Sequence, residues 1–405
     1  MLVGLIASLA IIANFSSDFF VGSNPDVALK LNPLKPNARL IIAQNLVAKN
    51  LNSNEKTRSL DEAQRHLKVA MSLSPSDARS FGFMGVVQAQ QGNADEALAH
   101  FHHAQNLSPA EFHSLLHMFL HNLQNNQFSE ATERLSLIFK RWPSQIERIE
   151  PLLPLILTRP EGVQKLIEIL PENPKGLMTL LDLTTKDPAN IRLTVPLVQA
   201  WVKNDVEGSV GASNFVLSRM ITARQYNLAY FFYRSILPYR DQSDSAYVIN
   251  GNFERSPSSS PFDWRIRDQA GVVTTINTAS GTENGYLEIR FLDSPVRYQG
   301  ISQVVRLPPG RYTLSIDYET LGLKGPKPLE VYIRCLENSS LVEKMAFLDG
   351  TNVDARLELN VEIPTERCKL QKLSISSAPF AQSWQNRFDG LIRIKNVAAR
   401  RESNV

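Results

Sequence analysis

The sequence predicts a multidomain chain, α-helical first and β-stranded second, in which an α-solenoid precedes an antiparallel β-sandwich. Three observations support this prediction. In the first half, segments that end in proline recur at a constant spacing, as stacked helical repeats do. After a linker at residues 241–247, the spacing of apolar residues changes from helical to alternating. Turn sequences then separate the alternating runs, as they do in packed antiparallel sheets.

The composition is that of an ordinary globular protein. The chain has 405 residues, of which 43% are hydrophobic and 20% charged. This length is enough for two or three domains with their own cores. The net charge of +3 does not favour nucleic acid, and the short tail at residues 400–405 holds only Arg400 and Arg401 as a basic cluster. We therefore expect no nucleic-acid partner.

Residues 1–21 begin with an almost wholly apolar run, MLVGLIASLAIIANF. A spanning helix needs about 20 residues, and the run reaches that length only by including Asp18. It also lacks the basic residues that begin a signal peptide. We interpret residues 1–21 as an uncleaved membrane anchor. A start codon placed too late in a longer anchor or signal, and a buried first helix, are the alternatives.

Residues 25–143 contain the repeats. Four segments end at Pro33, Pro75, Pro109 and Pro143, and the last two spacings are both 34 residues (75 to 109 and 109 to 143). The first spacing is longer by about one loop. Apolar residues between the prolines follow the helical period, so each unit is expected to be a pair of helices.

The unit that ends at Pro109 indicates how its helices pack. Gly85 on the first helix and Ala97 on the second are small and let the helices approach, and Phe101 fills the layer beside them. The period, this small–small–aromatic pattern and the closing proline resemble the tetratricopeptide repeat. The resemblance implies a curved stack of helices whose groove holds a peptide or a partner protein.

Beyond Pro143 the repeat pattern decays. Residues 144–240 contain short apolar segments broken by proline, and a repeat-like pair of helices resumes from Asn214 and ends at Pro238. We interpret this range as degenerate helical repeats that continue the solenoid.

Three of the seven histidines recur every four residues, at His113, His117 and His121. This spacing places them on one face of a helix, and the register with the preceding unit makes that helix an inner one. We interpret them as part of a polar groove wall for a protein partner. The alternatives are a metal site and a set of imidazoles that become charged together near pH 6.

Residues 248–399 predict the sandwich. Apolar and polar residues alternate in several runs, which are bounded by turn sequences such as PPG and GPKP. About nine such strands, each with one apolar face, suggest two antiparallel sheets packed face to face. The clearest runs are residues 286–291, 311–319, 328–335 and 356–363.

The sandwich region resembles the jelly-roll carbohydrate-binding modules that share a galactose-binding-like fold. The residues that carry the resemblance are VINGNFE, Trp264, ISQVVRLPPGRYTLSIDYE and FDGLIRIKNVAA. The resemblance implies a polysaccharide ligand, although such sandwiches also bind lipids and proteins. Sugar binding needs a flat apolar face and flanking polar groups. The candidates are Trp264, Arg290, Tyr298, Gln299 and Trp384. The alternative for both tryptophans is a half-buried place in the sandwich.

Two further features concern metals and cysteines. Calcium is frequent in this fold, and the oxygens of Asn250, Asn252 and Glu254 are possible ligands, although the same residues also suit a simple turn. No other cofactor is expected.

Cys335 and Cys368 are the two cysteines. They are compatible with one disulfide or with two buried thiols.

The segments VYIRC and PTERCKLQKLSI resemble membrane-anchored repeat proteins associated with bacterial exopolysaccharide production. Those proteins share the order of apolar start, helical repeats and terminal sandwich. The resemblance implies a protein anchored in the bacterial inner membrane, with its remaining part in the periplasm, that takes part in the production of a surface polysaccharide.

No hydrolase or nucleotide-binding motif is present, neither G-x-S-x-G, H-E-x-x-H nor G-x-x-x-x-G-K-[ST]. We therefore predict a non-enzymatic scaffold with a protein partner in the helical groove and a polysaccharide on the sandwich. A pure protein adaptor is the first alternative. A cryptic glycan-active enzyme, with carboxylates such as Glu288, Asp317 and Glu319 as its acids, is the second.

Overall fold

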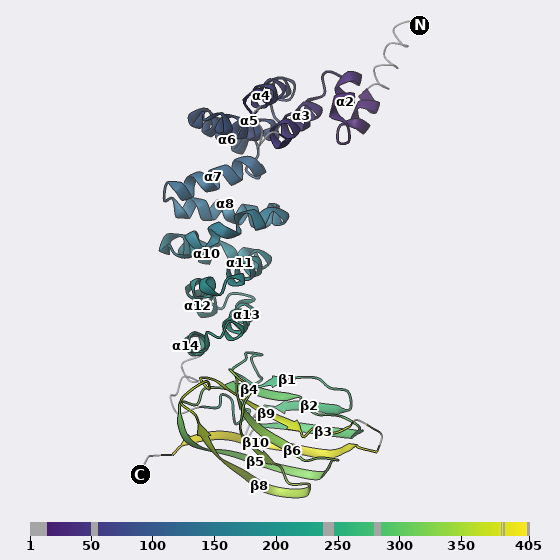
Figure 1. Ribbon diagram of the computed structural model, residues 1–405, viewed down its shortest axis with the longest axis vertical. Helices are drawn as coiled ribbons and strands as arrows, with labels where there is room; N and C mark the ends of the chain where they lie inside the picture. Colours follow the sequence, from purple (N-terminus) through teal and green to yellow (C-terminus); the bar gives the residue numbers. More distant parts are fainter. Residues whose placement is uncertain are drawn as a thin grey trace. The chain divides into compact units, whose positions relative to one another are not determined.

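The computed structural model describes residues 14–49, 56–237, 247–278, 285–381, 383 and 385–402. Helices occupy the first part and two antiparallel sheets the second, which confirms the predicted fold class (Figure 1). The helices are α2 (Pro25–Leu31), α3 (Pro36–Lys49), α4 (Lys56–Leu73), α5 (Ala78–Gln91), α6 (Ala94–Leu107), α7 (Phe112–Gln124), α8 (Phe128–Arg141), η1 (Pro143–Leu152), α9 (Leu153–Leu157), α10 (Pro160–Ile169), η2 (Leu170–Glu172), α11 (Pro174–Lys186), η3 (Pro188–Thr194), α12 (Val195–Lys203), α13 (Ser209–Thr222) and α14 (Tyr226–Ile236).

The residues that begin and end the helices agree with the pattern in the sequence. The side chain of Asp77 accepts a hydrogen bond from the Arg79 amide and caps α5, and Gly92, with a φ of 90°, ends it in the left-handed region. A Cβ at Gly85 would lie 2.5 Å from the Phe101 ring. Glycine is therefore required where α5 and α6 approach each other.

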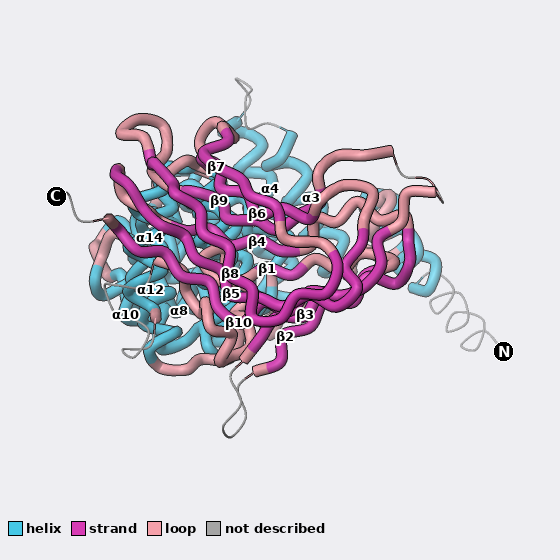
Figure 2. Tube along the Cα trace, turned by 90° about the horizontal axis from the view of Figure 1, so that it is seen from below, coloured by secondary structure: helices cyan, strands magenta, loops and turns pink. Residues whose placement is uncertain are grey.

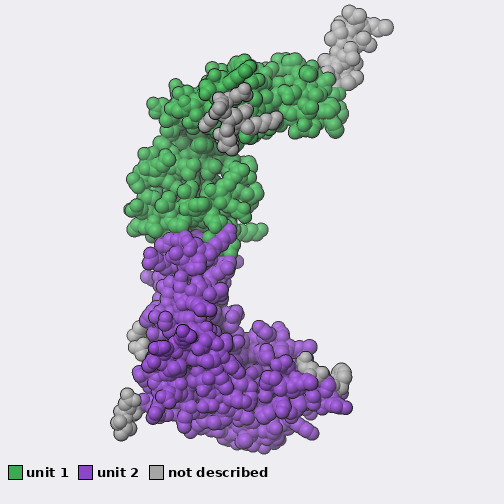
Figure 3. All heavy atoms as spheres, in the orientation of Figure 1, with its two compact units in different colours: residues 1–183 green, residues 184–405 purple. Residues whose placement is uncertain are grey.

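The chain forms two compact units, residues 1–183 and residues 184–405 (Figure 3). The core of unit 1 includes Leu67, Met84 and Phe101, all buried. Unit 2 combines the end of α11 and the helices from η3 onward with the sandwich. The boundary between the units lies before η3, inside the range that the sequence suggested as degenerate repeats.

Unit 2 contains two five-stranded sheets, with orders β1-β4-β9-β6-β7 and β2-β3-β10-β5-β8. All neighbouring strands are antiparallel, and Figure 2 shows β8, β5, β10, β3 and β2 side by side. The strands are β1 (Arg265–Ile266), β2 (Val272–Asn277), β3 (Tyr286–Ser294), β4 (Ile301–Val305), β5 (Gly310–Lys324), β6 (Leu329–Cys335), β7 (Leu341–Ala346), β8 (Gly350–Ile363), β9 (Gln371–Ser377) and β10 (Phe388–Arg401).

A disulfide joins Cys335, at the end of β6, to Cys368, which precedes β9. Both residues are buried in the sandwich core. The buried amide of Gln371 donates to the Cys368 carbonyl at 2.6 Å and to the Leu307 carbonyl at 3.3 Å. The covalent bond and these hydrogen bonds together hold the segment before β9 against the core.

Helix α14 contacts the sandwich within unit 2. The Tyr233 ring stacks on Phe262, with ring centres 4.9 Å apart and planes at 22°. The guanidinium of Arg306 lies 4.8 Å from the Tyr230 ring centre. From α13, the Asn214 amide donates to the Ser258 carbonyl at 3.0 Å. These helices therefore share an interface with the sandwich.

The predicted location in the bacterial inner membrane is corrected. Within the described part of the chain, no helix is both long and apolar enough to cross a bilayer. Residues 1–13 of the predicted anchor lie outside the described residues. In the remainder, the Ser17 hydroxyl donates to the Ala28 carbonyl at 2.9 Å, and Asp18 pairs with Lys35 at 2.6 Å. These polar contacts interrupt the apolar character of the run.

Candidate functional site

The outer face of the sheet β2-β3-β10-β5-β8 carries the candidate site. On β3 the alternation buries Leu287, Ile289 and Phe291 in the core and turns Glu288 and Arg290 outward. The register places Arg393 of β10 opposite Glu288 of β3 on one side. On its other side, Arg393 lies opposite Glu319 of β5. Charged residues far apart in the sequence thus meet in one line across three strands.

Ion pairs connect these side chains into a continuous array. The Arg393 guanidinium donates to Glu288 at 2.7 Å and to Glu319 at 3.1 Å. Lys395 pairs with Glu319 at 2.9 Å. Arg290 and Asp354 extend the array at its two ends, each at 2.9 Å from its partner. We call these six residues the charged row: Arg290, Glu288, Arg393, Glu319, Lys395 and Asp354.

Two carboxylates of the charged row, Glu288 and Glu319, have pKa values below their ordinary range. Burial alone would raise the pKa of Glu288, but hydrogen bonds from Arg393 and Arg290 outweigh it and hold the pKa below its ordinary value. A hydrogen bond from Lys395 is the largest effect on Glu319, and its pKa is also lowered. Three basic and three acidic side chains therefore leave the row close to neutral.

The same electrostatics limit what the row can do chemically. A glycosidase needs one carboxyl group that stays protonated to act as a general acid. Glu288 and Glu319 both accept hydrogen bonds from Arg393 and both have lowered pKa values. This pair is therefore suited to hydrogen bonding rather than to acid catalysis.

An aromatic ring lies within the charged row. The Arg393 guanidinium carbon is 5.3 Å from the centre of the Tyr286 ring, and Tyr286 is half-buried on the outer face. The ring contact and the two carboxylates together hold the guanidinium in place. The arrangement presents preorganised donors and acceptors beside a partly apolar surface.

Trp264 and Tyr298 do not form the expected sugar-stacking platform. Trp264 is 1% exposed and Tyr298 is fully buried. The indole of Trp264 donates to the Asn250 carbonyl at 2.9 Å and packs on Phe253. Burial raises the pKa of Tyr298. Both rings belong to the sandwich core, so the prediction that they face a ligand is corrected.

The remaining predicted sugar-binding residues lie in different places. Arg290 is exposed and belongs to the charged row. Gln299 is exposed near β4, and its backbone amide donates to the Gln269 side chain at 2.7 Å. Trp384 lies outside the described residues. The structure therefore brings Arg290 alone of this set into the charged row.

One of the three possible calcium ligands, Asn250, is engaged in a turn. The amide group of Asn250 donates to the Arg255 carbonyl at 2.9 Å and accepts from the Arg255 amide at 3.4 Å. Across the residues that the structure describes, no group of three or more His, Cys, Asp or Glu side chains is arranged to hold a metal ion. Calcium binding here stays a prediction.

The histidines of α7 pack against aromatic rings of unit 1. His117 stacks on Phe101, with ring centres 4.6 Å apart, and His113 meets the edge of Phe83 at 5.2 Å. Burial lowers the pKa of both. His121 hydrogen-bonds Asn125 at 3.0 Å. The four-residue spacing thus places His113 and His117, both half-buried, at a helix packing surface. Their role in a groove wall for a protein partner stays a prediction.

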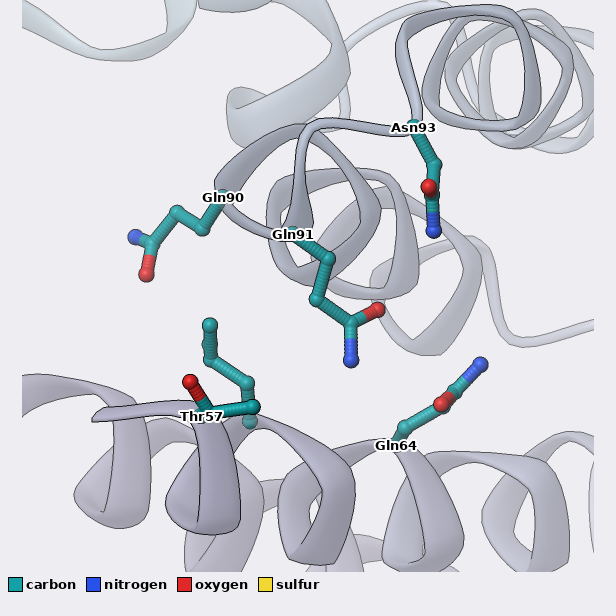
Figure 4. Close-up of a pocket in the computed structure, with 6 residues that line it drawn as sticks. Thr57, Gln64, Gln90, Gln91 and Asn93 are labelled. Atoms are coloured by element: carbon teal, nitrogen blue, oxygen red, sulfur yellow. The ribbon is translucent and has the colours of Figure 1, made fainter. Parts of the chain in front are cut away.

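A polar pocket of about 430 Å³ lies between α4 and α5 in unit 1 (Figure 4). Gln90, Gln91 and Asn93 line one side, and Thr57 and Gln64 line the other. The Gln91 amide donates to Asp61 at 3.0 Å. These residues could not be identified from the sequence, because amides on a helix surface carry no motif.

Comparisons with known proteins find similar solved structures for part of the chain only. No family model matches the sequence, and no curated protein matches it. Solved structures that are similar include a CBM4 carbohydrate-binding module (16% identical, covering 38% of this chain and 99% of that one, TM-score 0.30). A CBM61 module in complex with β-1,4-galactotriose is 16% identical and covers 39% of this chain and 99% of that one, with a TM-score of 0.25. The C-terminal family 22 carbohydrate-binding module of Clostridium thermocellum Xyn10B is 12% identical and covers 40% and 99%, with a TM-score of 0.27.

Proposed function

We propose that this chain is a non-enzymatic binding protein whose sandwich holds a neutral polysaccharide across the charged row. The observation that supports the proposal is the row itself. Its donors and acceptors lie on the rigid face of a sheet and are fixed by one another before a ligand arrives. Preorganised groups of this kind bind sugar hydroxyls without the entropic cost of ordering side chains.

The charge balance favours a neutral ligand. Each carboxylate in the row already has a basic partner within 3.1 Å. A hydroxyl adds a charge-assisted hydrogen bond to such a pair without leaving a charge uncompensated. A polyuronate or polyphosphate would bring further negative charge beside Glu288 and Glu319, and this repulsion is unfavourable.

The helical part is proposed to bind a partner protein. The specific observation is the pocket between α4 and α5, which is lined largely by side-chain amides. Amide groups both donate and accept, so they suit the backbone of an extended peptide.

The resemblance to repeat proteins of exopolysaccharide loci suggests a role in surface-polysaccharide production. A pure protein adaptor is the alternative, and it requires that no glycan binds.

Arg393→Met is expected to weaken polysaccharide binding by at least about tenfold, because hydrogen bonds to charged groups contribute about 1.5–3 kcal/mol. Calorimetry or affinity electrophoresis of the full chain with β-glucan, xylan, galactan and a polyuronate measures this. The matched control is Arg334→Met on the opposite sheet, where the guanidinium also lies 5.3 Å from a tyrosine ring, that of Tyr332. Equal weakening by both variants, or binding of no neutral polymer, would contradict the proposal.

A further inference from the structure

A small pocket adjoins the charged row and has a mixed lining. It lies between β5, β8 and β10 and has a volume of about 180 Å³. Leu321, Val353 and Leu391 form its apolar wall, and Glu319, Arg393 and Asn352 supply polar groups. Leu321 is 60% exposed and Val353 75% exposed. Exposed apolar side chains beside fixed hydrogen-bonding groups are characteristic of ligand sites.

The pocket results from irregularities in the strands. The register between β5 and β8 shifts on both sides of Thr320. Gly390 of β10 has a φ of 83°, and a Cβ there would lie 2.3 Å from the Gly322 carbonyl oxygen. Bulges of this kind bend a strand and redirect its side chains. The hollow is therefore part of the backbone fold rather than a gap between flexible side chains.

The orientation of Asn352 is fixed. Its amide nitrogen donates to the buried Thr320 hydroxyl at 2.9 Å and to the Asp349 carbonyl at 2.9 Å. The backbone amide of Asn352 also donates to Thr320, at 3.2 Å. Because both amide hydrogens are used, the side-chain carbonyl oxygen is left to accept a hydrogen bond from a ligand.

Arg393 supplies the complementary donor. Its Nε donates to Glu288 and its Nη1 to Glu319. A guanidinium carries five N–H groups, so donors remain for a ligand carbonyl at the edge of the pocket. An apolar wall, an acceptor and a donor thus converge on one small volume.

We propose, on the basis of the polysaccharide-binding function above, that this pocket takes the acetamido group of an N-acetylated sugar. The methyl group packs on Leu321 and Val353, the carbonyl oxygen accepts from Arg393, and the N–H donates to Asn352. A plain hydroxyl leaves the apolar wall unfilled, and an O-acetyl group has no hydrogen for Asn352. A carboxylate would lie against Glu319. The acetamido group matches all three features.

Two matched pairs of sugars test this with the full chain: chitotetraose against cellotetraose, and N-acetylgalactosamine against galactose. In at least one pair the N-acetylated sugar is expected to bind at least about tenfold more tightly, because filling an apolar pocket and pairing its polar groups both contribute. Isothermal titration calorimetry gives the ratio directly. No preference in either pair would overturn the acetamido inference. If neutral sugars still bind in that case, the proposal that the charged row holds a polysaccharide stands. Binding of no sugar or polysaccharide overturns both proposals.

Variants separate the pocket from the rest of the face. Leu321→Ser with Val353→Ser should reduce the preference for the N-acetylated sugar to within about twofold. The control is Leu292→Ser with Val273→Ser, which changes two exposed residues of the same sheet, on β3 and β2, and should leave the preference unchanged. If the control removes the preference as strongly, the pocket is not the acetamido site.

Discussion

Phe262→Ala is expected to lower the free energy of unfolding of unit 2 by about 3–5 kcal/mol, the usual cost of removing a buried phenylalanine. Phe262 is 2% exposed. Its ring stacks on Tyr233 and meets the edge of Tyr230 at 6.0 Å. The substitution therefore leaves a cavity where α14 contacts the sandwich, and both sides of that contact lose packing.

Hydrogen exchange of the full chain, resolved by segment, measures this effect and locates it. The account predicts faster exchange in α14 and in the strands of the sandwich together, since they share the interface. Phe231→Ala is the control, because Phe231 is on the same helix but 59% exposed, so its loss removes a contact with Arg306 without leaving a buried cavity. Faster exchange in α14 with unchanged strands would show that the helix only rests on an independently stable sandwich.

Removal of the disulfide by Cys335→Ala with Cys368→Ala should destabilise the sandwich by about 3–4 kcal/mol. The bond closes a loop of 33 residues. Without the bond, the unfolded chain regains conformational entropy that the closed loop had removed. For a loop of this length, that gain in entropy corresponds to about the stated loss of stability. Alanine avoids placing a hydroxyl in a buried site.

Urea unfolding, monitored by hydrogen exchange in β6 and β9, gives the difference in the free energy of unfolding between the double variant and the unsubstituted chain. Reductant should destabilise the unsubstituted chain by a similar amount and have no effect on the double variant. A loss below about 1 kcal/mol in both comparisons would mean that the bond contributes little beyond the hydrogen bonds of Gln371.

Much of the fold follows from local patterns in the sequence. The approach of Gly85 to Phe101 was predictable, because a 34-residue spacing and a small–small–aromatic pattern describe contacts between adjacent helices. The alternation in β3 likewise predicted that Leu287 and Ile289 face inward and Glu288 outward. Periodicity fixes the face of a strand, and burial of that face then follows.

The site itself depends on information that local patterns do not contain. Glu288 and Arg393 are 105 residues apart, and they meet because β10 lies between β3 and β5. No local pattern specifies that strand order or the register shifts near Thr320. The same limit explains Trp264. In the core its indole donates a hydrogen bond to the Asn250 carbonyl of a preceding turn, a contact that periodicity cannot predict.

A crystal structure of the chain with a bound neutral oligosaccharide tests the central claim most directly. The account predicts sugar hydroxyls within hydrogen-bonding distance of Glu288, Arg393 and Glu319, on the outer face of β3, β10 and β5. A sugar bound on the outer face of the other sheet, or on the helices, with the charged row unoccupied, would contradict it.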